Sequence, residues 1–455
     1  MRPVSGKYIV ILILLSIFFI SGTDFLSAEN IDSGTESKIE KQEIQWRTER
    51  EFPPGPLTPT NVLAAPFRIP ELLLRLAFLP LQTFVEFSEK VDLPHRAYDF
   101  FSNDDHTVFY YPTTTGGTLK FSDTEGLTLG ATFYDSKFID RERKLKIKAD
   151  VSTHEDFSGS IHYSLPADRA KPYFYTLHLR YHRKGGVLFY GIGNDSDNDN
   201  ESIFSEETGE VTLDIGRKLK SVRSLIPYLT VGYISSRTNT TEKRGSRSSI
   251  ESFFNTDELE GFGESIDFML YGLTLMYDNR IPVSNPYQGH MMELSFLRGD
   301  GMGNSTYAFN CTHFGYARVF DIYRHNRLVN VGFQVEYTDG FGKEVPFNYL
   351  STLGEKSPLR GFNEGRFRDP GFMLFNMEYS YPVWRGFIPT VKGMGTVFLD
   401  LGKTFDELDD LETGSIQYSV GTGLAFTIAI KTYIRMQIGY GGEDLNFIAA
   451  MSRSF

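Results

Sequence analysis

The chain has 455 residues, a formal net charge of −12 and one cysteine, Cys311. The negative charge argues against a nucleic-acid partner, which requires a basic face. A single cysteine excludes an internal disulfide framework and a cysteine-rich metal site. Aromatic residues make up 15% of the chain and glycine is abundant, a combination that favours an all-β membrane protein with aromatic girdles over a helical enzyme.

The first residues have the pattern of an export signal. Arg2 and Lys7 form a positive start, residues 8–20 are an unbroken apolar run, and residues 26–28 (LSA) offer a cleavage site. Such a run is too short to cross a hydrocarbon core of about 30 Å as a helix. Residues 1–28 are therefore predicted to be a cleaved signal peptide, and no later apolar run is long enough for a helical membrane span.

The next segment divides into a linker and a helix. Residues 29–70 are predicted to be disordered and proline-rich, because 29–52 are charged and 53–70 carry six prolines. Residues 71–106 are predicted to form a short helical extension in the periplasm, with a kink at Pro80. The apolar side of this helix either packs against the rest of the protein or lies on a membrane or in a pore.

Residues 107–455 show the two-residue alternation of strands that have one apolar and one wet face. Residues 143–153, for example, alternate Leu145 and Ile147 with Lys146 and Lys148. Sixteen strands are predicted in this way: 115–121, 126–135, 143–153, 158–165, 173–183, 209–217, 226–235, 267–277, 288–297, 306–318, 326–336, 372–383, 391–401, 414–427, 430–440 and 445–455.

The connections between these strands support a barrel. The three longest, 184–208, 237–266 and 337–371, all follow odd-numbered strands and therefore lie on one side, as external loops do. The last strand also fits, because Phe447 lies on its apolar face and Phe455 ends the chain, as in barrels whose last strand pairs with the first. The predicted fold class is all-β: a sixteen-stranded antiparallel transmembrane β-barrel with a short helical amino-terminal extension.

Three motifs follow one another in the last third of the chain. The longest loop contains LRGF (359–362), the next strand contains NMEYSYP (376–382), and the strand after that contains FLDLG (398–402). In this order they resemble the bacterial surface-antigen superfamily of outer-membrane barrels, which includes the BamA and TamA assembly proteins and the two-partner-secretion transporters. The resemblance covers about 107–455 and implies insertion or translocation of protein or lipid at the bacterial outer membrane.

Strand parity points to a luminal site. In 372–383, residues from Met373 to Tyr381 at odd positions are apolar and predicted to face lipid, so Asn376 and Glu378 face the lumen. The same argument turns Phe398 and Asp400 inward on the next strand.

An arginine fork suits a carboxylate, so we expect the loop to fold back into the lumen and Arg360 to pair with Asp400, Glu378 or both. The resemblance implies the same latch, with Gly361 against the wall and Phe362 packed beside it. Arg366, Arg368 and Asp369 extend the network in this interpretation. The alternative is a set of solvated charges in a wide pore and an exposed loop.

Several other sites are rejected. His178 and His182 are about 13 Å apart on one strand face, too far to share a metal. The segment DSDNDNES (195–202) lacks the glycine and flanking helices of a calcium loop and is predicted to be a solvated loop tip. The sequence offers no catalytic triad or lipase elbow, so no enzyme is expected and no cofactor is assigned. Residues 29–106 also lack the alternating strands of the polypeptide-transport-associated domains that the family's assembly proteins carry.

Three functional hypotheses remain. In the first, the barrel inserts or translocates an unfolded protein or lipid client, with the Arg360 loop as a latch. In the second it is a passive pore or structural barrel, in which the latch and helix 71–101 occlude the lumen. In the third it is a surface adhesin that uses 184–208 and 237–266. The expected partners are outer-membrane lipids or lipopolysaccharide and, for the barrel's own insertion, the outer-membrane assembly machinery.

Overall fold

A computed structural model describes residues 113–450 except for 123–125, 139–142, 155, 168–171, 220–223, 282–285, 304, 324, 326, 355–358, 386–390, 408–409, 411–414 and 429–431. The predictions for the signal peptide (1–28), the linker (29–70), the helical extension (71–106) and Phe455 lie outside these residues. No helix in the described ranges is both long enough and apolar enough to cross a membrane.

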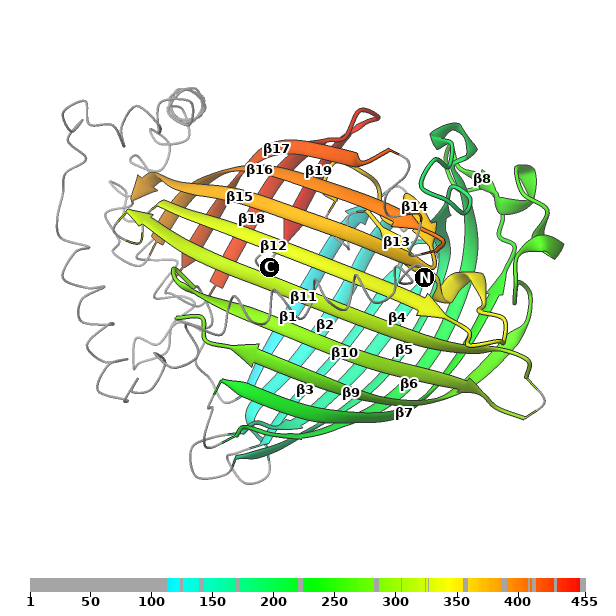
Figure 1. The fold of residues 1–455 in the computed structure, drawn as a ribbon, viewed down its shortest axis with the longest axis horizontal. Coiled ribbons are helices and arrows are strands. Elements are labelled where there is room, and N and C mark those ends of the chain that lie inside the picture. Colours follow the sequence, from blue (N-terminus) through cyan, green and yellow to red (C-terminus); the bar gives the residue numbers. More distant parts are fainter. Residues whose placement is uncertain are drawn as a thin grey trace, which may run out of the picture.

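Sixteen long strands form one continuous antiparallel sheet in chain order (Figure 1). They are β1 (Thr113–Ser122), β2 (Gly126–Phe138), β3 (Arg143–Ser152), β4 (Phe157–Leu165), β5 (Tyr173–Phe189), β6 (Ser202–Arg217), β7 (Leu225–Asn239), β9 (Ser265–Asp278), β10 (Gly289–Gly301), β11 (Ala308–Tyr323), β12 (Arg327–Asp339), β15 (Gly371–Arg385), β16 (Val391–Phe405), β17 (Gln417–Ile428), β18 (Thr432–Tyr440) and β19 (Leu445–Ala450). The predicted all-β class and each of the sixteen predicted strands are confirmed.

The long connections carry small elements of their own. β8 (Ser248–Ser249) pairs in parallel with β6, and β13 (Ser351–Leu353) pairs with β14 (Phe367–Asp369) as a separate hairpin. The 3₁₀ turns are η1 (Asn198–Asn200), η2 (Ile250–Ser252), η3 (Thr256–Glu258) and η4 (Phe347–Tyr349).

The strands near the long loops run further than the sequence predicts. The connection expected at 184–208 is shorter, because β5 continues to Phe189 and β6 begins at Ser202. A register shift between Lys184 and Val187 interrupts the alternation. Past this shift the successive residues Ile203 and Phe204 are both buried. The alternation of apolar and polar residues, which identifies a strand in the sequence, is therefore missing there.

The outer face of the sheet is apolar and exposed, as expected of a lipid-facing surface. Leu129, Leu229 and Phe447 are 58%, 58% and 65% exposed. Tyr381 has the same strand parity as the exposed Met377, but its side chain is 0% exposed. Tyr381 pairs with Gly395 across the ladder and stacks on Tyr379, so the missing side chain of Gly395 lets the ring lie down on the wall.

The sheet curves round so that β1 to β6 lie behind β7 to β12 in Figure 1. Among the described residues β1 pairs with β2 and β19 pairs with β18, and no ladder joins β1 to β19. The structure therefore establishes a curved sixteen-stranded sheet. The predicted closure of this sheet into a barrel is not observed among the described residues.

An apolar cluster lies at the end of the sheet that carries the long loops. We call it the cap, and it consists of Phe189, Phe204, Ile250, Leu259 and Phe347. Its members come from β5, β6, the connection 240–264 and the connection 340–370. The cap therefore joins the two longest connections to the wall, at the right-hand end of Figure 1.

Candidate functional site: a buried arginine network

The connection 340–370 between β12 and β15 packs against the inner face of the sheet. Leu359 and Phe362 share a buried cluster with Phe372 and Leu374, which point inward from β15. Phe362 also meets Phe367 edge-to-face at 5.1 Å between ring centroids. Because Leu359 and Phe362 are anchored in this apolar cluster, Arg360, which lies between them in the sequence, is held against the polar inward-facing residues of β15 and β16.

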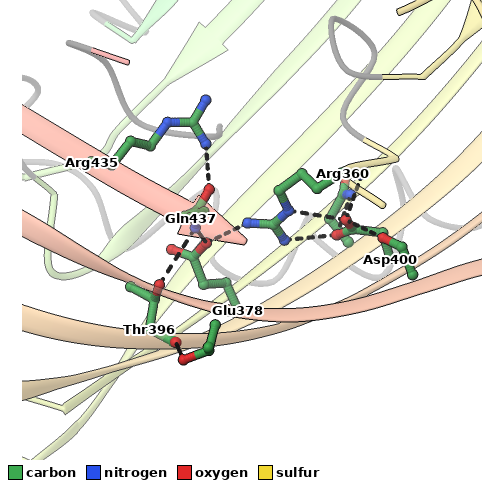
Figure 2. Close-up of polar contacts among 9 residues, drawn as sticks. Arg360, Glu378, Thr396, Asp400, Arg435 and Gln437 are labelled. Atoms are coloured by element: carbon green, nitrogen blue, oxygen red, sulfur yellow. Dashed lines mark hydrogen bonds and ion pairs between the residues drawn. The ribbon is translucent and has the colours of Figure 1, made fainter. Parts of the chain in front are cut away.

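Arg360 bridges two carboxylates on neighbouring strands (Figure 2). Its Nη2 donates to Asp400 Oδ1 at 2.7 Å and its Nε to Asp400 Oδ2 at 2.9 Å. Its backbone N–H donates to the same Oδ2 at 3.0 Å. The remaining guanidinium arm, Nη1, donates to Glu378 Oε2 at 2.5 Å. The structure thus brings together the loop arginine and both carboxylates expected to face the lumen.

The strand register explains why Asp400 is so well satisfied. Asp400 lies directly opposite Asn376 on β15 and Ser419 on β17. Asn376 Nδ2 donates to Asp400 Oδ1 at 2.8 Å, and Ser419 Oγ donates to Asp400 Oδ2 at 3.0 Å. Asp400 therefore accepts hydrogen bonds from both neighbouring strands and from the loop, which fixes its two oxygens for a bidentate arginine contact.

Glu378 has a second partner that sequence reasoning missed. Gln437 of β18 donates from Nε2 to Glu378 Oε2 at 2.9 Å and lies 3.4 Å from Thr396 Oγ1 of β16. Arg435 donates to the side-chain oxygen of Gln437 at 3.0 Å (Figure 2). The alternation of 430–440 indicates that Gln437 points inward. Whether it lies level with Glu378 along the sheet depends on strand register, which the sequence does not reveal. The latch, defined here as Arg360, Glu378, Asp400 and Gln437, therefore reaches three strands of the sheet's carboxyl-terminal part.

Phe398 and two glycines shape the space around Arg360. The guanidinium carbon lies 3.6 Å from the centroid of the Phe398 ring, a cation–π contact. A Cβ on Gly421, opposite Phe398, would come within 2.2 Å of that ring. A Cβ on Gly361 would come within 2.5 Å of the backbone nitrogen of Gly441. Both positions therefore require glycine for close approach rather than for turn geometry.

The charged side chains of the latch are buried. Arg360 and Asp400 are each 0% exposed and Glu378 is 4% exposed. Burial opposes the charge on Arg360, but the hydrogen bonds and the negative charges of Asp400 and Glu378 prevail and raise the pKa of Arg360. An uncompensated charge at this depth would be costly, so removal of one partner destabilises the others.

The other loop residues assigned to the network go to separate places. Arg366 forms a bidentate contact with Glu443 in the β18–β19 turn, with Nε and Nη2 within 3.0 Å of its carboxylate. Arg368 is 5% exposed and donates to the carbonyl of Phe347. Burial raises the pKa of the Asp369 carboxyl to about 6, and the negative charges of Asp406 and Asp410 act in the same direction.

The rejected sites also have clear positions. Across the β4–β5 ladder His178 faces His162, with 3.3 Å between their Nδ1 atoms, while His182 faces Glu206 at 3.6 Å. Within the described ranges no three His, Cys, Asp or Glu side chains are grouped to hold a metal. In the connection 190–201, Asp197 caps η1 by accepting from the Asp199 N–H. Asp195, Asp197 and Asp199 are exposed, as predicted for a solvated tip, whereas Glu201 is half-buried and pairs with Arg247.

Comparison with known proteins agrees with this fold. Residues 137–440 match the Omp85 superfamily domain, and no curated protein matches the sequence at a significant level. The fold is similar to BamA from Haemophilus ducreyi lacking POTRA domains 1–3, with a TM-score of 0.54 at 14% identity over 74% of this chain and 70% of that one.

A second similar structure is CdiB from Escherichia coli, with a TM-score of 0.53 at 10% identity over 75% of this chain. The chain spans 62% of CdiB, less than two thirds of its length. The family match covers well over half of the present sequence. It confirms the resemblance to outer-membrane barrels that the motifs LRGF, NMEYSYP and FLDLG indicated. The chain belongs to the Omp85 superfamily of bacterial outer-membrane β-barrel proteins.

Proposed function

We propose that this protein is a closed sixteen-stranded barrel that inserts or translocates a protein or lipid client at the outer membrane. In this proposal β1 and β19 meet at a seam, and the seam opens to admit the client. The client, outer-membrane lipids or lipopolysaccharide, and the assembly machinery that inserts the barrel itself are the partners. The activity is not enzymatic and needs no cofactor.

The observation that carries the proposal is the position of the latch. Arg360 joins the loop to β15 and β16 through Glu378 and Asp400, and Gln437 extends the same network to β18. In the described part of the chain, β19 is the one strand between β18 and the end of the sheet. The buried cation Arg360 thus links the strands that lie next to the proposed seam. In this proposal it limits how far β15 to β18 move when the seam opens.

The cap argues against the passive pore. Phe347 contacts Phe189 and Phe204 with ring centroids 5.7 and 5.2 Å apart, and all three side chains are at most 1% exposed. This packed core lies at the long-loop end, where a pore would open. An open conducting pore would keep this end open to water, whereas an occluded structural barrel or a barrel that admits clients sideways can keep it covered. The adhesin hypothesis gains no support, because Ile250 and Leu259 of the connection 240–264 are buried in the cap.

The test is insertion of a client into liposomes. Purified full-length protein is reconstituted and mixed with a urea-unfolded barrel protein, and the folded, protease-protected fraction is followed over time. We expect acceleration over empty liposomes and its loss in Arg360→Ala. Arg237→Ala is the matched control, since Arg237 is exposed on the outer face of β7.

The outcomes separate the hypotheses. If the folded wild-type protein gives no acceleration, the assembly role is wrong and the structural barrel is favoured. If Arg360→Ala folds and accelerates insertion as well as wild type, the latch has no part in the activity. Steady conductance through wild-type protein in planar bilayers would support the passive pore.

A further inference from the structure

A polar cavity of about 270 Å³ lies between the inner face of β5 and β6 and the connection 340–370. Arg180 and His182 of β5, Glu206 of β6 and Arg368 of β14 are among its lining residues. None of the lining residues belongs to the latch. The cavity is therefore a second polar region of the interior, beneath the cap and on the opposite half of the sheet's strand order.

Arg368 is a buried cation that has no counter-ion among the described residues. Its side chain is 5% exposed, and its one protein hydrogen bond goes from Nη1 to the carbonyl of Phe347 at 2.9 Å. Nε is buried and has no hydrogen-bond partner. In the described part of the chain no carboxylate is within ion-pair distance of it, and burial lowers its pKa to about 10. A buried guanidinium in this state is destabilising unless an anion meets it.

Other donors face the same space. His182 Nδ1 is buried without a partner, while its Nε2 lies 3.6 Å from Glu206. Arg180 stands at the next inward position of β5 and makes no ion pair within the described ranges. Lys184 follows His182 along the same inward row. One side of the cavity therefore presents nitrogen donors in succession.

The carboxylates of the cavity are largely engaged elsewhere. Asp156 accepts from Arg244 Nη1 at 3.0 Å and from the backbone N–H of Gly185 at 2.7 Å. Glu206 accepts from Asn348 Nδ2 at 3.2 Å and attracts Arg368 without touching it. Glu364 is the third acid. With Arg244 included, the arginines and lysine outnumber the acids by one, so the site favours an anion.

The neighbouring wall continues the positive character. Arg180 is level with Ser160 on β4 and Lys148 on β3 in the strand register. Lys146 occupies the inward position next to Lys148, whereas Ile147 between them is 40% exposed on the outer face. Lys148 is paired with Asp150. Lys146, Lys148 and Arg180 thus lie on the inner wall that leads to the cavity, with Glu210 of β6 directly opposite Arg180.

We propose that this cavity binds a phosphate group, with Arg368 and Arg180 as its principal ligands and His182 as a further donor. Guanidinium forks match the oxygens of phosphate, and a doubly charged oxyanion compensates a buried arginine better than a neutral ligand. The phosphate comes either from a lipid headgroup or from a free phosphate ion. This inference concerns binding alone and stands whether or not the barrel assembles clients.

The test uses purified full-length protein in detergent micelles. Isothermal titration calorimetry measures the affinity for inorganic phosphate and, in a second arm, for phosphatidic acid in mixed micelles, with phosphatidylcholine as the uncharged reference. Arg180→Gln is the main variant, because the Arg180 side chain makes no hydrogen bond or ion pair with the described residues and its replacement should leave folding intact. Arg368→Gln tests the buried ligand, and Arg237→Gln is the matched control on the outer face.

We expect measurable binding in at least one arm, weakened about tenfold or more by Arg180→Gln and by Arg368→Gln, and unchanged in Arg237→Gln. Binding of phosphatidic acid alone would identify a lipid headgroup, and binding of both would identify the phosphate itself as the determinant. No binding in either arm, or equal weakening in all three variants, would overturn the proposal. So would Arg180-dependent binding of an acidic peptide without binding of phosphate.

Discussion

Arg360 and Asp400 are joined by three hydrogen bonds, two from the guanidinium and one from the backbone N–H of Arg360. We predict that Arg360→Ala and Asp400→Ala each destabilise the folded barrel by about 3–5 kcal/mol, because each leaves a buried charge without its partner. The double variant should cost less than the sum of the two. Urea unfolding of the reconstituted protein measures all three values.

The strands themselves should survive these changes. Circular dichroism of both single variants should show wild-type strand content, while the temperature at which the folded band disappears on a gel should fall. Free energies that add fully in the double variant would show that the two residues do not interact in the membrane-embedded protein.

Gly361 allows the loop backbone to touch the turn after β18. We predict that Gly361→Ala costs about 1–3 kcal/mol, because its Cβ would lie 2.5 Å from the backbone nitrogen of Gly441, which cannot move aside as a side chain can. The matched control is Gly209→Ala in β6, where the nearest atom to the new Cβ is 3.9 Å away. Protease sensitivity of the connection 340–370 measures the effect, and equal behaviour of the two variants would contradict the close approach.

The comparison of sequence and structure shows where local pattern is sufficient. Glu378 and Asp400 were placed inward because alternation has a period of two and one face of each strand is apolar. The sequence did not predict that Ser419 and Gln437 are hydrogen-bond partners of Asp400 and Glu378. Which residues lie level with each other on neighbouring strands depends on the strand register. Register follows from the packing of many strand pairs and leaves no local trace in the sequence.

The loops were the least predictable part for a related reason. The cap joins Ile250 and Leu259 to Phe347, and Arg366 meets Glu443, so these contacts connect segments far apart in the chain. No short-range periodicity encodes such contacts. The sequence therefore predicted that the loop at 337–371 folds back into the lumen, but it did not predict the apolar cluster that joins this loop to the connection 240–264.

Arg366 connects the loop to the last hairpin of the sheet. We predict that Arg366→Ala destabilises this connection by about 2 kcal/mol, since it removes the bidentate contact with Glu443 and the hydrogen bonds to Ser196. Arg366→Lys should recover only part of the loss, because an ammonium group cannot reproduce the fork. Limited proteolysis within 190–201 gives the measurement, and full rescue by lysine would show that charge alone matters.

Asp369 gives the folded protein a pH dependence of defined sign. Burial raises its pKa to about 6, above the value of about 3.9 in an unfolded chain. Between these values the folded state holds the proton more tightly, so the contribution to stability is complete below about pH 4 and is lost as the pH rises through about 6.

Asp369→Asn removes this dependence. We predict that the variant is more stable than wild type by up to about 3 kcal/mol at about pH 7.5 and differs little from it at about pH 4. Urea unfolding at a series of pH values provides the test, with Asp257→Asn as the control in a connection that lies outside the latch. A gain in stability that does not change with pH would show that Asp369 titrates normally.

Phe347 lies at the centre of the aromatic contacts of the cap. Its ring is 1% exposed and lies 5.8 Å or less from those of Phe189, Phe204 and Phe262. We predict that Phe347→Ala costs about 3–5 kcal/mol locally, as expected for truncation of a buried aromatic side chain. It should also raise the conductance of the protein in planar bilayers, because the cavity that it leaves loosens both connections. Phe253→Ala is the matched control, since Phe253 belongs to the connection 240–264 but is 46% exposed. If both variants conduct as little as wild type while Phe347→Ala is folded and destabilised, water is excluded by another part of the chain than the cap.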